Sequence, residues 1–172
     1  MPIAAQKKKR KVVKMKKFAL IAIIFLCSAA AFPCFAENVS AENVSANLIK
    51  SWLSENYGCK IDDDGDIILK TGNDSTVIIK IIPKLNAIHI YSMYSPYNKR
   101  SRREMVELAN KFNCDKRLLR VAISEDGTSV CDCYFSYDGG LNSKNLTETL
   151  KWFIIMDGAW CDFVINGGDK NE

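Results

Sequence analysis

The alternation of apolar and polar residues between Ile61 and Tyr97 is the feature around which the rest of the chain is organised. Short runs rich in β-branched residues are separated there by Asp-Gly, Gly-Asn-Asp and Pro-Lys-Leu-Asn segments. Such runs, bounded by turn residues, are typical of consecutive antiparallel strands. The stretch therefore predicts a meander of strands, and helices on either side of it would need a face of this sheet to bury their own apolar positions.

The first half of the chain predicts one helix followed by four strands. Apolar residues at helical spacing indicate a helix over residues 46–56. The Asp64-Gly65 pair suits a tight hairpin, and Pro83, which has no N–H, ends or borders the third strand. The four strands are expected at Tyr57–Asp62, Asp66–Thr71, Ser75–Ile82 and Ala87–Tyr94.

The second half predicts two helices around one further hairpin. The first of these helices is expected at Ser101–Asn113, and the two strands of the hairpin at Leu118–Ser124 and Ser129–Tyr137. A third helix begins near residue 142 or 143, and we expect Gly158 to kink or end it because glycine is a poor helix former. The order helix, four strands, helix, two strands, helix predicts an α+β fold. In this fold an antiparallel sheet of about six strands carries the helices on one face.

Residues 1–36 have the pattern of a secretory signal peptide. Two lysines precede the apolar run Phe18–Leu26, and small residues follow it. This order of positive charge, apolar core and small residues marks a segment that is removed on export. We expect cleavage after Ala36, with Ala31 as the second choice, and hence a periplasmic or secreted protein. The apolar run is shorter than the roughly 20 residues of a membrane span, so no membrane anchor is expected after cleavage.

The basic run Lys7–Val12 (KKKRKV) also looks like a nuclear localisation signal, but directly before an export core it is better explained as a long basic leader. Met15 is an alternative start, which would leave residues 1–14 outside the protein. Residues 36–45 contain the short repeat AENVS-AENVS, which has no apolar period, so we expect a flexible linker over 37–45. One domain over residues 46–165 and a tail over 166–172 complete the division.

The charge of the chain is divided unevenly. Residues 1–36 hold eight of the 24 Lys and Arg residues and none of the 20 Asp and Glu residues, so the remainder carries a net charge of −4. Binding to a phosphate backbone depends on clustered Lys and Arg. A mildly acidic domain therefore predicts no nucleic-acid partner.

The cysteines leave two interpretations open. Export would place them in an oxidising compartment, and their odd number after Ala36 leaves at least one unpaired or joined to another chain. We expect zero to two disulfides, whose pairing the sequence does not assign. Cys131 and Cys133 are two apart on a predicted strand and so share a face; a reactive pair there would make a small exported thiol protein, the alternative function. The five cysteines after Ala36 are Cys59, Cys114, Cys131, Cys133 and Cys161.

No residue pattern predicts catalysis, a metal site or a cofactor. His89 is the sole histidine and no C-x-x-C occurs, so zinc-type ligation is not indicated. The aspartates at 62–66 do not fit a calcium loop, because its twelfth position would be Asn73 instead of an acid. A single histidine without a nearby nucleophile is weak support for acyl transfer. We therefore expect a protein that is not an enzyme.

Apolar residues occupy both faces of the two central predicted strands, whereas helices can cover only one. An uncovered apolar face usually marks a partner surface. We expect this face to bind a protein or peptide, or a second copy of the chain in a homodimer. The alternative, that loops or the third helix cover it, stays open. The predicted partner-binding residues are Ile78, Ile82, Tyr91, Met93 and Tyr97.

Several short segments together resemble the YbjN domain family of bacterial sensory transduction regulators. They are the glycine, apolar, acidic and Asp-Gly-Asp pattern of Gly58–Asp66, then LANKFN (Leu108–Asn113), VAISEDGTSV (Val121–Val130) and a glycine before the last helix, Gly140. The resemblance covers roughly residues 46–165. It implies a compact α+β fold similar to that of type III secretion chaperones, which bind protein partners and often pair as dimers. It implies no enzyme activity, and this chain departs from the family in its export signal and its five mature cysteines.

Overall fold

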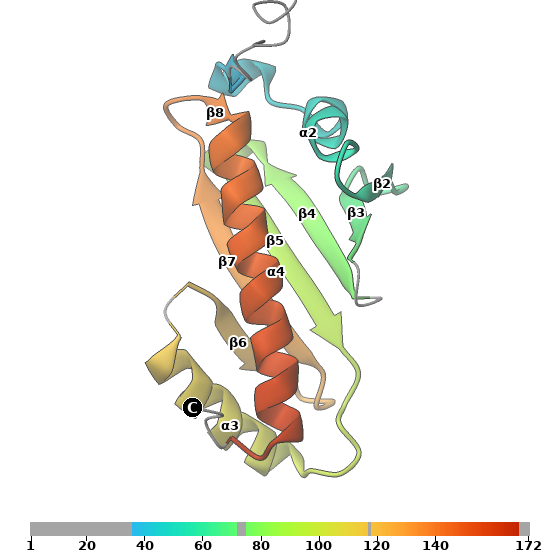
Figure 1. Cartoon of the computed structure of the whole chain (residues 1–172), viewed down its shortest axis with the longest axis vertical. Helices are drawn as coiled ribbons and strands as arrows, with labels where there is room; N and C mark the ends of the chain where they lie inside the picture. The colour runs from blue at the N-terminus through green and yellow to red at the C-terminus, as the bar shows by residue number, and fades with distance from the viewer. Residues whose placement is uncertain (1–35, 72–74, 117, 169–172) are drawn as a thin grey trace, which may run out of the picture. The chain divides into compact units, whose positions relative to one another are not determined.

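The computed structural model describes residues 36–71, 75–116 and 118–168, and from Glu37 onward these form one compact unit. The predicted leader, its cleavage at Ala31 and the basic run therefore fall on residues that the structure does not describe. Residues 169–172 of the predicted tail lie outside the described residues as well. Within the described unit, a layer of helices packs on a layer of strands (Figure 1).

The sheet has six antiparallel strands in the order β2-β3-β4-β5-β7-β6, and the predicted α+β class is confirmed. The hairpin between β4 and β5 is closed by the 3-10 turn Pro83–Leu85 and by Asn86 in the left-handed conformation. Strands β5 and β7 pair over their whole length, from Ala87 opposite Ser136 to Tyr94 opposite Ser129. The strands are β2 (Gly58–Ile61), β3 (Ile67–Lys70), β4 (Thr76–Ile82), β5 (Ala87–Tyr94), β6 (Arg120–Ile123) and β7 (Ser129–Ser136).

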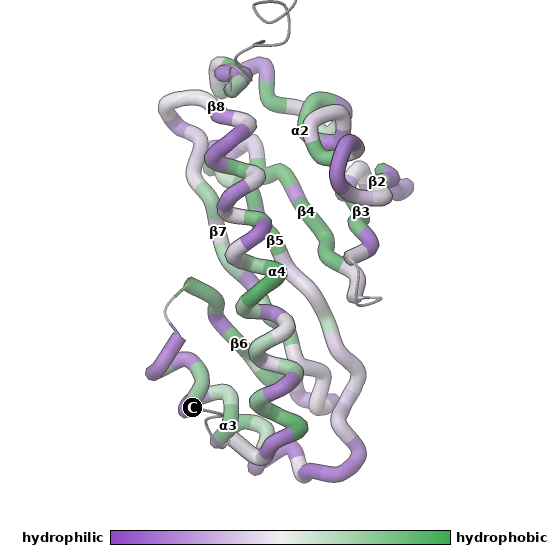
Figure 2. Tube along the Cα trace, viewed as in Figure 1, coloured by the Kyte–Doolittle hydropathy of each residue, from purple (hydrophilic) through white to green (hydrophobic). Residues whose placement is uncertain are grey.

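Three helices cover one face of this sheet: α2 (Ala46–Leu53), α3 (Arg102–Asp115) and α4 (Ser143–Ile165). Each begins where a side chain caps its first turn, and Ser101 with Glu104 forms a complete capping box at α3. Figure 2 shows hydrophobic positions concentrated in β4 and recurring along α4. Among the described residues, no helix combines the length and the apolar character that a bilayer span requires.

The prediction that Gly158 kinks or ends the last helix is wrong, because α4 continues through it to Ile165. A glycine inside a helix costs about 1 kcal/mol relative to alanine. Burial of a large side chain such as the neighbouring Trp160, which is fully buried in the core, contributes more than that. Packing against the sheet therefore overrides the local preference.

The segment 37–45, expected to be a flexible linker, contains a short strand and a turn of 3-10 helix. Strand β1 (Asn38–Val39) pairs antiparallel with β8 (Leu141–Asn142), and the 3-10 turn spans Ala41–Asn43. Gly140 precedes β8 with φ +99°, and a Cβ there would lie 2.7 Å from the carbonyl oxygen of Val39. Glycine is required at this point both for its backbone angle and for the close approach of β1.

Candidate functional site: the open face of the sheet

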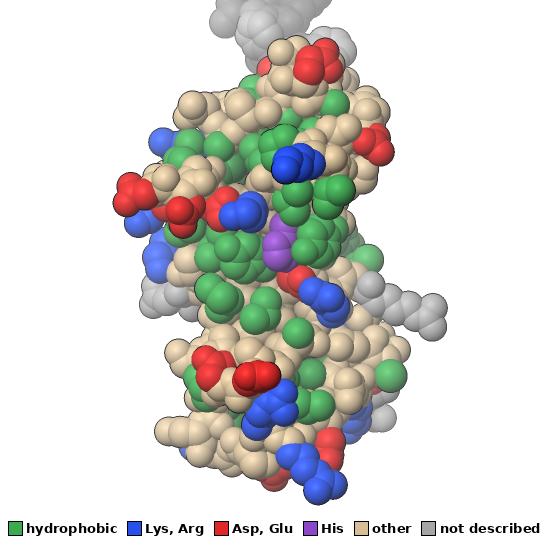
Figure 3. Space-filling view, turned by 180° about the vertical axis from the view of Figure 1, so that it is seen from behind, with side chains coloured by type: hydrophobic (Ala, Val, Ile, Leu, Met, Phe, Trp, Pro, Cys, Tyr) green, Lys and Arg blue, Asp and Glu red, His purple; other side chains and the backbone are tan. Residues whose placement is uncertain are grey.

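Side chains that point away from the helices form the candidate site, which we call the open face. Ile79 and Ile90, which pair across β4 and β5, are fully buried under the helices. Because side chains alternate along a strand, their neighbours point to the opposite side. Figure 3 views the molecule from behind the helices and shows hydrophobic side chains gathered around the single histidine. The open face comprises Ile68, Ile78, Lys80, Ile82, His89, Tyr91, Met93, Asp132 and Tyr134.

Four of the five predicted partner-binding residues lie together on the open face. Ile78 is paired directly opposite Tyr91, and Met93 is 55% exposed. Ile82 lies further along β4 and is partly exposed. Tyr97 is separate, because it lies beyond the end of β5 and packs against the hydrophobic core. That these residues bind a partner stays a prediction.

His89 lies at the centre of a stack of three rings on the open face. Its ring centroid is 4.4 Å from that of Tyr134 and 4.7 Å from that of Tyr91, and both pairs are stacked. Its Nε2 atom lies 3.1 Å from Oδ2 of Asp132, which is 3% exposed. The sequence interpretation of His89 as an isolated strand-face histidine missed this acid, because Asp132 comes from β7 and the adjacency of β5 and β7 is not visible locally.

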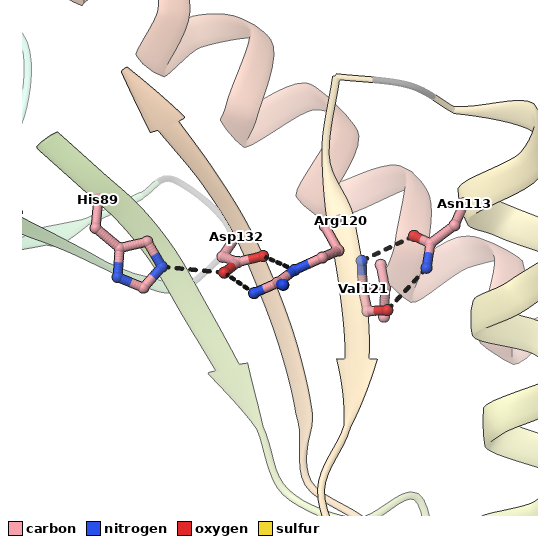
Figure 4. A network of polar contacts seen from close by, with 5 residues as sticks. All are labelled: His89, Asn113, Arg120, Val121 and Asp132. Carbon is pink, nitrogen blue, oxygen red and sulfur yellow. Dashed lines mark hydrogen bonds and ion pairs between the residues drawn. The ribbon is translucent and has the colours of Figure 1, made fainter. Parts of the chain in front are cut away.

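Arg120 on β6 binds the same carboxylate from the other side (Figure 4). Its Nε donates to Oδ1 of Asp132 at 2.9 Å and its Nη2 to Oδ2 at 2.6 Å, which is a bidentate pair. The hydrogen bonds and charge of Asp132 raise the pKa of Arg120. The carboxylate is therefore occupied by two partners from neighbouring strands.

This cluster has the geometry of a support, not of a catalytic triad. A triad needs a hydroxyl or thiol bonded to the second nitrogen of the histidine. Within the described ranges, Asp132 is the group that hydrogen-bonds His89, and tyrosine rings cover the faces of its ring. Arg120 and Asp132 thus hold His89 and Tyr134 in place as a preordered aromatic surface.

The aspartates of the β2–β3 hairpin serve the turn itself. Oδ1 of Asp62 accepts hydrogen bonds from the main-chain N–H groups of Asp64 and Asp66. Asp66 in turn pairs with Lys80 at 3.1 Å. In the part of the chain that the structure describes, no group of three acids, histidines or cysteines is placed to hold a metal ion.

The cysteine pair that motivated the alternative function points into the core. Cys131 and Cys133 share the helix-covered face of β7, opposite Ser92 and Ile90, and the five cysteines of the described unit are free thiols. Burial raises the pKa of Cys131 strongly and that of Cys133 to about 11. A protonated thiol is a poor nucleophile, so the geometry offers no support for thiol chemistry at neutral pH.

A second polar cluster, which sequence reasoning missed, connects α4 to the sheet. Asp157 is 3% exposed, and its two carboxylate oxygens accept hydrogen bonds from Ser92 Oγ and Tyr94 Oη, each at 2.5 Å. Burial and the hydrogen bond to this carboxylate raise the pKa of Tyr94. All these groups lie under the helices, so the cluster fixes how α4 packs instead of facing a ligand.

Comparison with known proteins identifies the family to which this fold belongs. The family model described as "Putative bacterial sensory transduction regulator", named YbjN, matches residues 45–156. The chain belongs to the YbjN family. The family match includes all six strands of the sheet, and the resemblance inferred from Gly58–Asp66 and from Val121–Val130 is confirmed. No curated protein sequence matches the chain.

Two solved structures are similar to this chain. "Crystal structure of YbjN, a putative transcription regulator from E. coli" matches with a TM-score of 0.54 at 13% identity, covering 66% of this chain and 84% of that one. "Structure of the HopA1-SchA Chaperone-Effector Complex" matches with a TM-score of 0.49 at 12% identity, covering 65% and 89%. At this level of identity the first match shows a shared fold and nothing about ligands.

Proposed function

We propose that this YbjN-family chain is an exported binding module that recognises a protein or peptide through the open face of its sheet. One observation carries the proposal: three helices cover one side of the sheet, while the other side presents Ile78, Tyr91 and Met93. Solvent-facing apolar surface of this kind favours association. The YbjN family is described as a group of regulators. We propose that this chain likewise acts by binding another molecule.

The arrangement of the open face suits recognition more than chemistry. Aromatic residues dominate the centre of protein interfaces because they supply large, rigid contact area. Tyr91 and Tyr134 are held against His89 by stacking, and His89 is held by Asp132. The surface is therefore ordered before a partner arrives, which reduces the entropic cost of binding.

Substitution of the face tests this function. We expect Tyr91→Asp combined with Met93→Asp to abolish partner binding without unfolding the domain, because both side chains are at least partly exposed. Ile155→Asp is the matched control, since Ile155 is 56% exposed but lies on α4, on the opposite side. A photo-crosslinking residue placed at 91 or at 155 in the producing cell reads out binding directly. Equal crosslinking at both positions, or none at 91, would contradict the assignment.

Export is tested separately from binding. Support comes from the order of charge, apolar core and small residues in 1–36, and from Glu37, whose main-chain carbonyl accepts a hydrogen bond from Ser143 N–H at 2.9 Å. Cleavage after Ala36 would thus leave the whole packed unit intact. We expect the mature protein to begin at Glu37 by N-terminal sequencing of the envelope or secreted fraction. An intact leader on cytosolic protein would refute export.

A further inference from the structure

The outer edge of β7 changes character where β6 ends. Strand β6 pairs with Ser129–Asp132 of β7, and the pairing stops at Arg120 opposite Asp132. The remaining residues, 133–136, pair with β5 on one side only. Exposure rises at the same point: Asp132 is buried, whereas Tyr134 and Ser136 are exposed.

Hydrogen-bond parity shows which main-chain groups face this open edge. The N–H of Tyr137 donates to the carbonyl of Asn86, at the start of β5, at 2.7 Å, so the main chain of Tyr137 faces β5. Directions alternate along an antiparallel strand. The N–H and C=O groups of Ser136 and Tyr134 must therefore face outward, as those of Asp132 do.

The hydrogen bonds of β6 show independently that the main chain of Asp132 faces outward from β5. The side chain of Asn113 donates to the carbonyl of Val121 at 2.9 Å and accepts from its N–H at 2.8 Å, which closes the edge of β6 (Figure 4). The main chain of Val121 therefore points away from β7, and that of its neighbour Arg120 points toward Asp132. Among the described residues, none pairs with the outward groups of Tyr134 or Ser136.

A hollow of about 600 Å³ lies beside this free edge. Its lining contains two cations, Lys116 and Arg120, and one carboxylate, Asp132, which pairs with Arg120. Lys116 thus leaves positive charge at the rim, while the apolar surface comes from Leu118, 65% exposed, and Tyr134, 59% exposed. The lining includes Asn113, Lys116, Leu118, Arg120, Asp132 and Tyr134.

We propose that an extended peptide segment of a partner protein adds as a further strand along Cys133–Ser136, with an apolar side chain against Leu118 and Tyr134 and a carboxylate near Lys116. Strand addition to a free edge supplies main-chain hydrogen bonds, and neighbouring pockets supply selectivity. A second copy of the chain would bring the same positive charge to the rim, whereas an acidic peptide complements it. The inference rests on the proposed function in one respect, that the ligand is a polypeptide.

The test begins with a phage-displayed library of random 12-residue peptides selected on the full chain. We expect enrichment of peptides that alternate apolar and acidic residues. Ser136→Pro should then weaken binding of an enriched peptide about tenfold or more, because it removes an N–H donor that faces the ligand. The proline is compatible with the sheet, since this N–H does not take part in the ladder to β5. Ser136→Ala, which keeps the N–H, is the matched control and should bind like the natural chain.

Amide hydrogen exchange on the natural chain provides a second readout that does not depend on a variant. The amides of Tyr134 and Ser136 should exchange rapidly in the free protein and slow about tenfold or more with the enriched peptide bound, while that of Phe135 is protected in both states. If exchange at 134 and 136 is unchanged and Tyr91→Asp abolishes binding, strand addition at the edge of β7 is wrong, whereas binding at the open face is supported. If the protection of these two amides increases with protein concentration in the absence of peptide, a second copy of the chain occupies the edge and the peptide proposal is wrong. Enrichment of no peptide would contradict strand addition alone, because the proposed function also includes a folded protein partner at the open face.

Discussion

Asp157 is a carboxylate buried under the helices, and its neighbours explain how it is tolerated there. A buried polar group destabilises the fold unless its hydrogen bonds are made. Ser92 and Tyr94, both on β5, supply one hydroxyl donor to each oxygen. In the sequence this residue stands beside Gly158 and looks like part of a helix end; its role depends on a strand 63 residues earlier.

Removal of this carboxylate should therefore destabilise the protein. In Asp157→Ala the buried hydroxyl of Ser92 and the part-buried hydroxyl of Tyr94 lose this acceptor, and we expect the free energy of unfolding to fall by on the order of 3 kcal/mol, measured by urea denaturation. Asp162→Ala is the control, because Asp162 is exposed on the same helix and should change stability by less than about 0.5 kcal/mol. Equal losses in the two variants would show that the buried network contributes nothing.

The thiol of Cys133 gives a pH-dependent prediction. With a pKa of about 11, about one thiol in a thousand is ionised at pH 8, whereas free cysteine, with a pKa of about 8.5, is ionised to roughly a quarter. Alkylation by iodoacetamide should be slow at pH 8 and accelerate about tenfold per pH unit toward pH 10, because the thiolate is the nucleophile. Mass spectrometry of the modified residue measures it, and urea-unfolded protein is the reference. Rapid modification of Cys133 itself in the folded chain at pH 7 would restore the thiol alternative.

The same shift has a defined sign for stability. The folded state raises the pKa of Cys133, so it favours the protonated form more than the unfolded chain does. The corresponding stabilisation is complete below the unfolded value of about 8.5 and is lost as the pH rises toward 11. Stability should therefore fall on the alkaline side.

Whole elements show how packing competes with local preference. Helix α4 contains Gly158, yet it stays regular because apolar side chains on both sides of this position are buried against the sheet. At Gly140, in contrast, local geometry decides the residue, because its positive φ and its close contact with β1 require a glycine. Two glycines in one chain therefore have opposite structural meanings.

These two positions make a paired prediction. Gly158→Ala should raise the free energy of unfolding by about 0.5–1 kcal/mol, because a Cβ at this position meets no atom within 4 Å and helix propensity improves. Gly140→Ala should lower it by about 1–3 kcal/mol through backbone strain and collision with the carbonyl of Val39. Thermal or urea unfolding of both variants checks the pair. Changes of the same sign would contradict the packing described for α4 and β1.

At the scale of the whole molecule, the segment before α2 belongs to the folded unit. Strand β1 joins the start of α4 through β8, and Trp52 Nε1 donates to a carboxylate oxygen of Glu37 at 2.5 Å. A domain boundary drawn at residue 46 from sequence would remove these contacts. The compact unit therefore begins nearer to the expected cleavage point than the linker interpretation implies.

Truncation distinguishes the two boundaries. A chain that begins at Glu37 should be as stable as the longer chain, whereas one that begins at Ala46 should lose on the order of 2 kcal/mol, because the hydrogen bonds of β1 with β8 and Ser143 are absent. Urea denaturation of both forms measures the difference. Equal stability would return residues 37–45 to the role of a linker.

Most secondary structure could be predicted because its causes are local. Alternation along β4 and β5 placed Ile79 and Ile90 inside and Ile78 and Tyr91 outside, and the structure agrees. The sheet of six strands followed from runs of β-branched residues between turn residues. Of the five residues predicted to bind a partner, four lie on one side of the sheet, whereas Tyr97 lies beyond the end of β5, where strand alternation no longer applies. That they bind a partner stays a prediction.

Local pattern thus settled the six strands of the main sheet, the three helices, their order and the two faces of each strand, because neighbouring residues alone dictate turns and periodicity. Strand adjacency and packing settled the rest. The pairing of β7 with β5 placed Asp132 against His89, and the packing of α4 on β5 placed Asp157 against Ser92. The early end of β6 left Tyr134 and Ser136 uncovered. These contacts join residues far apart in the chain, and their energies depend on burial and on partners that exist only once the sheet has assembled.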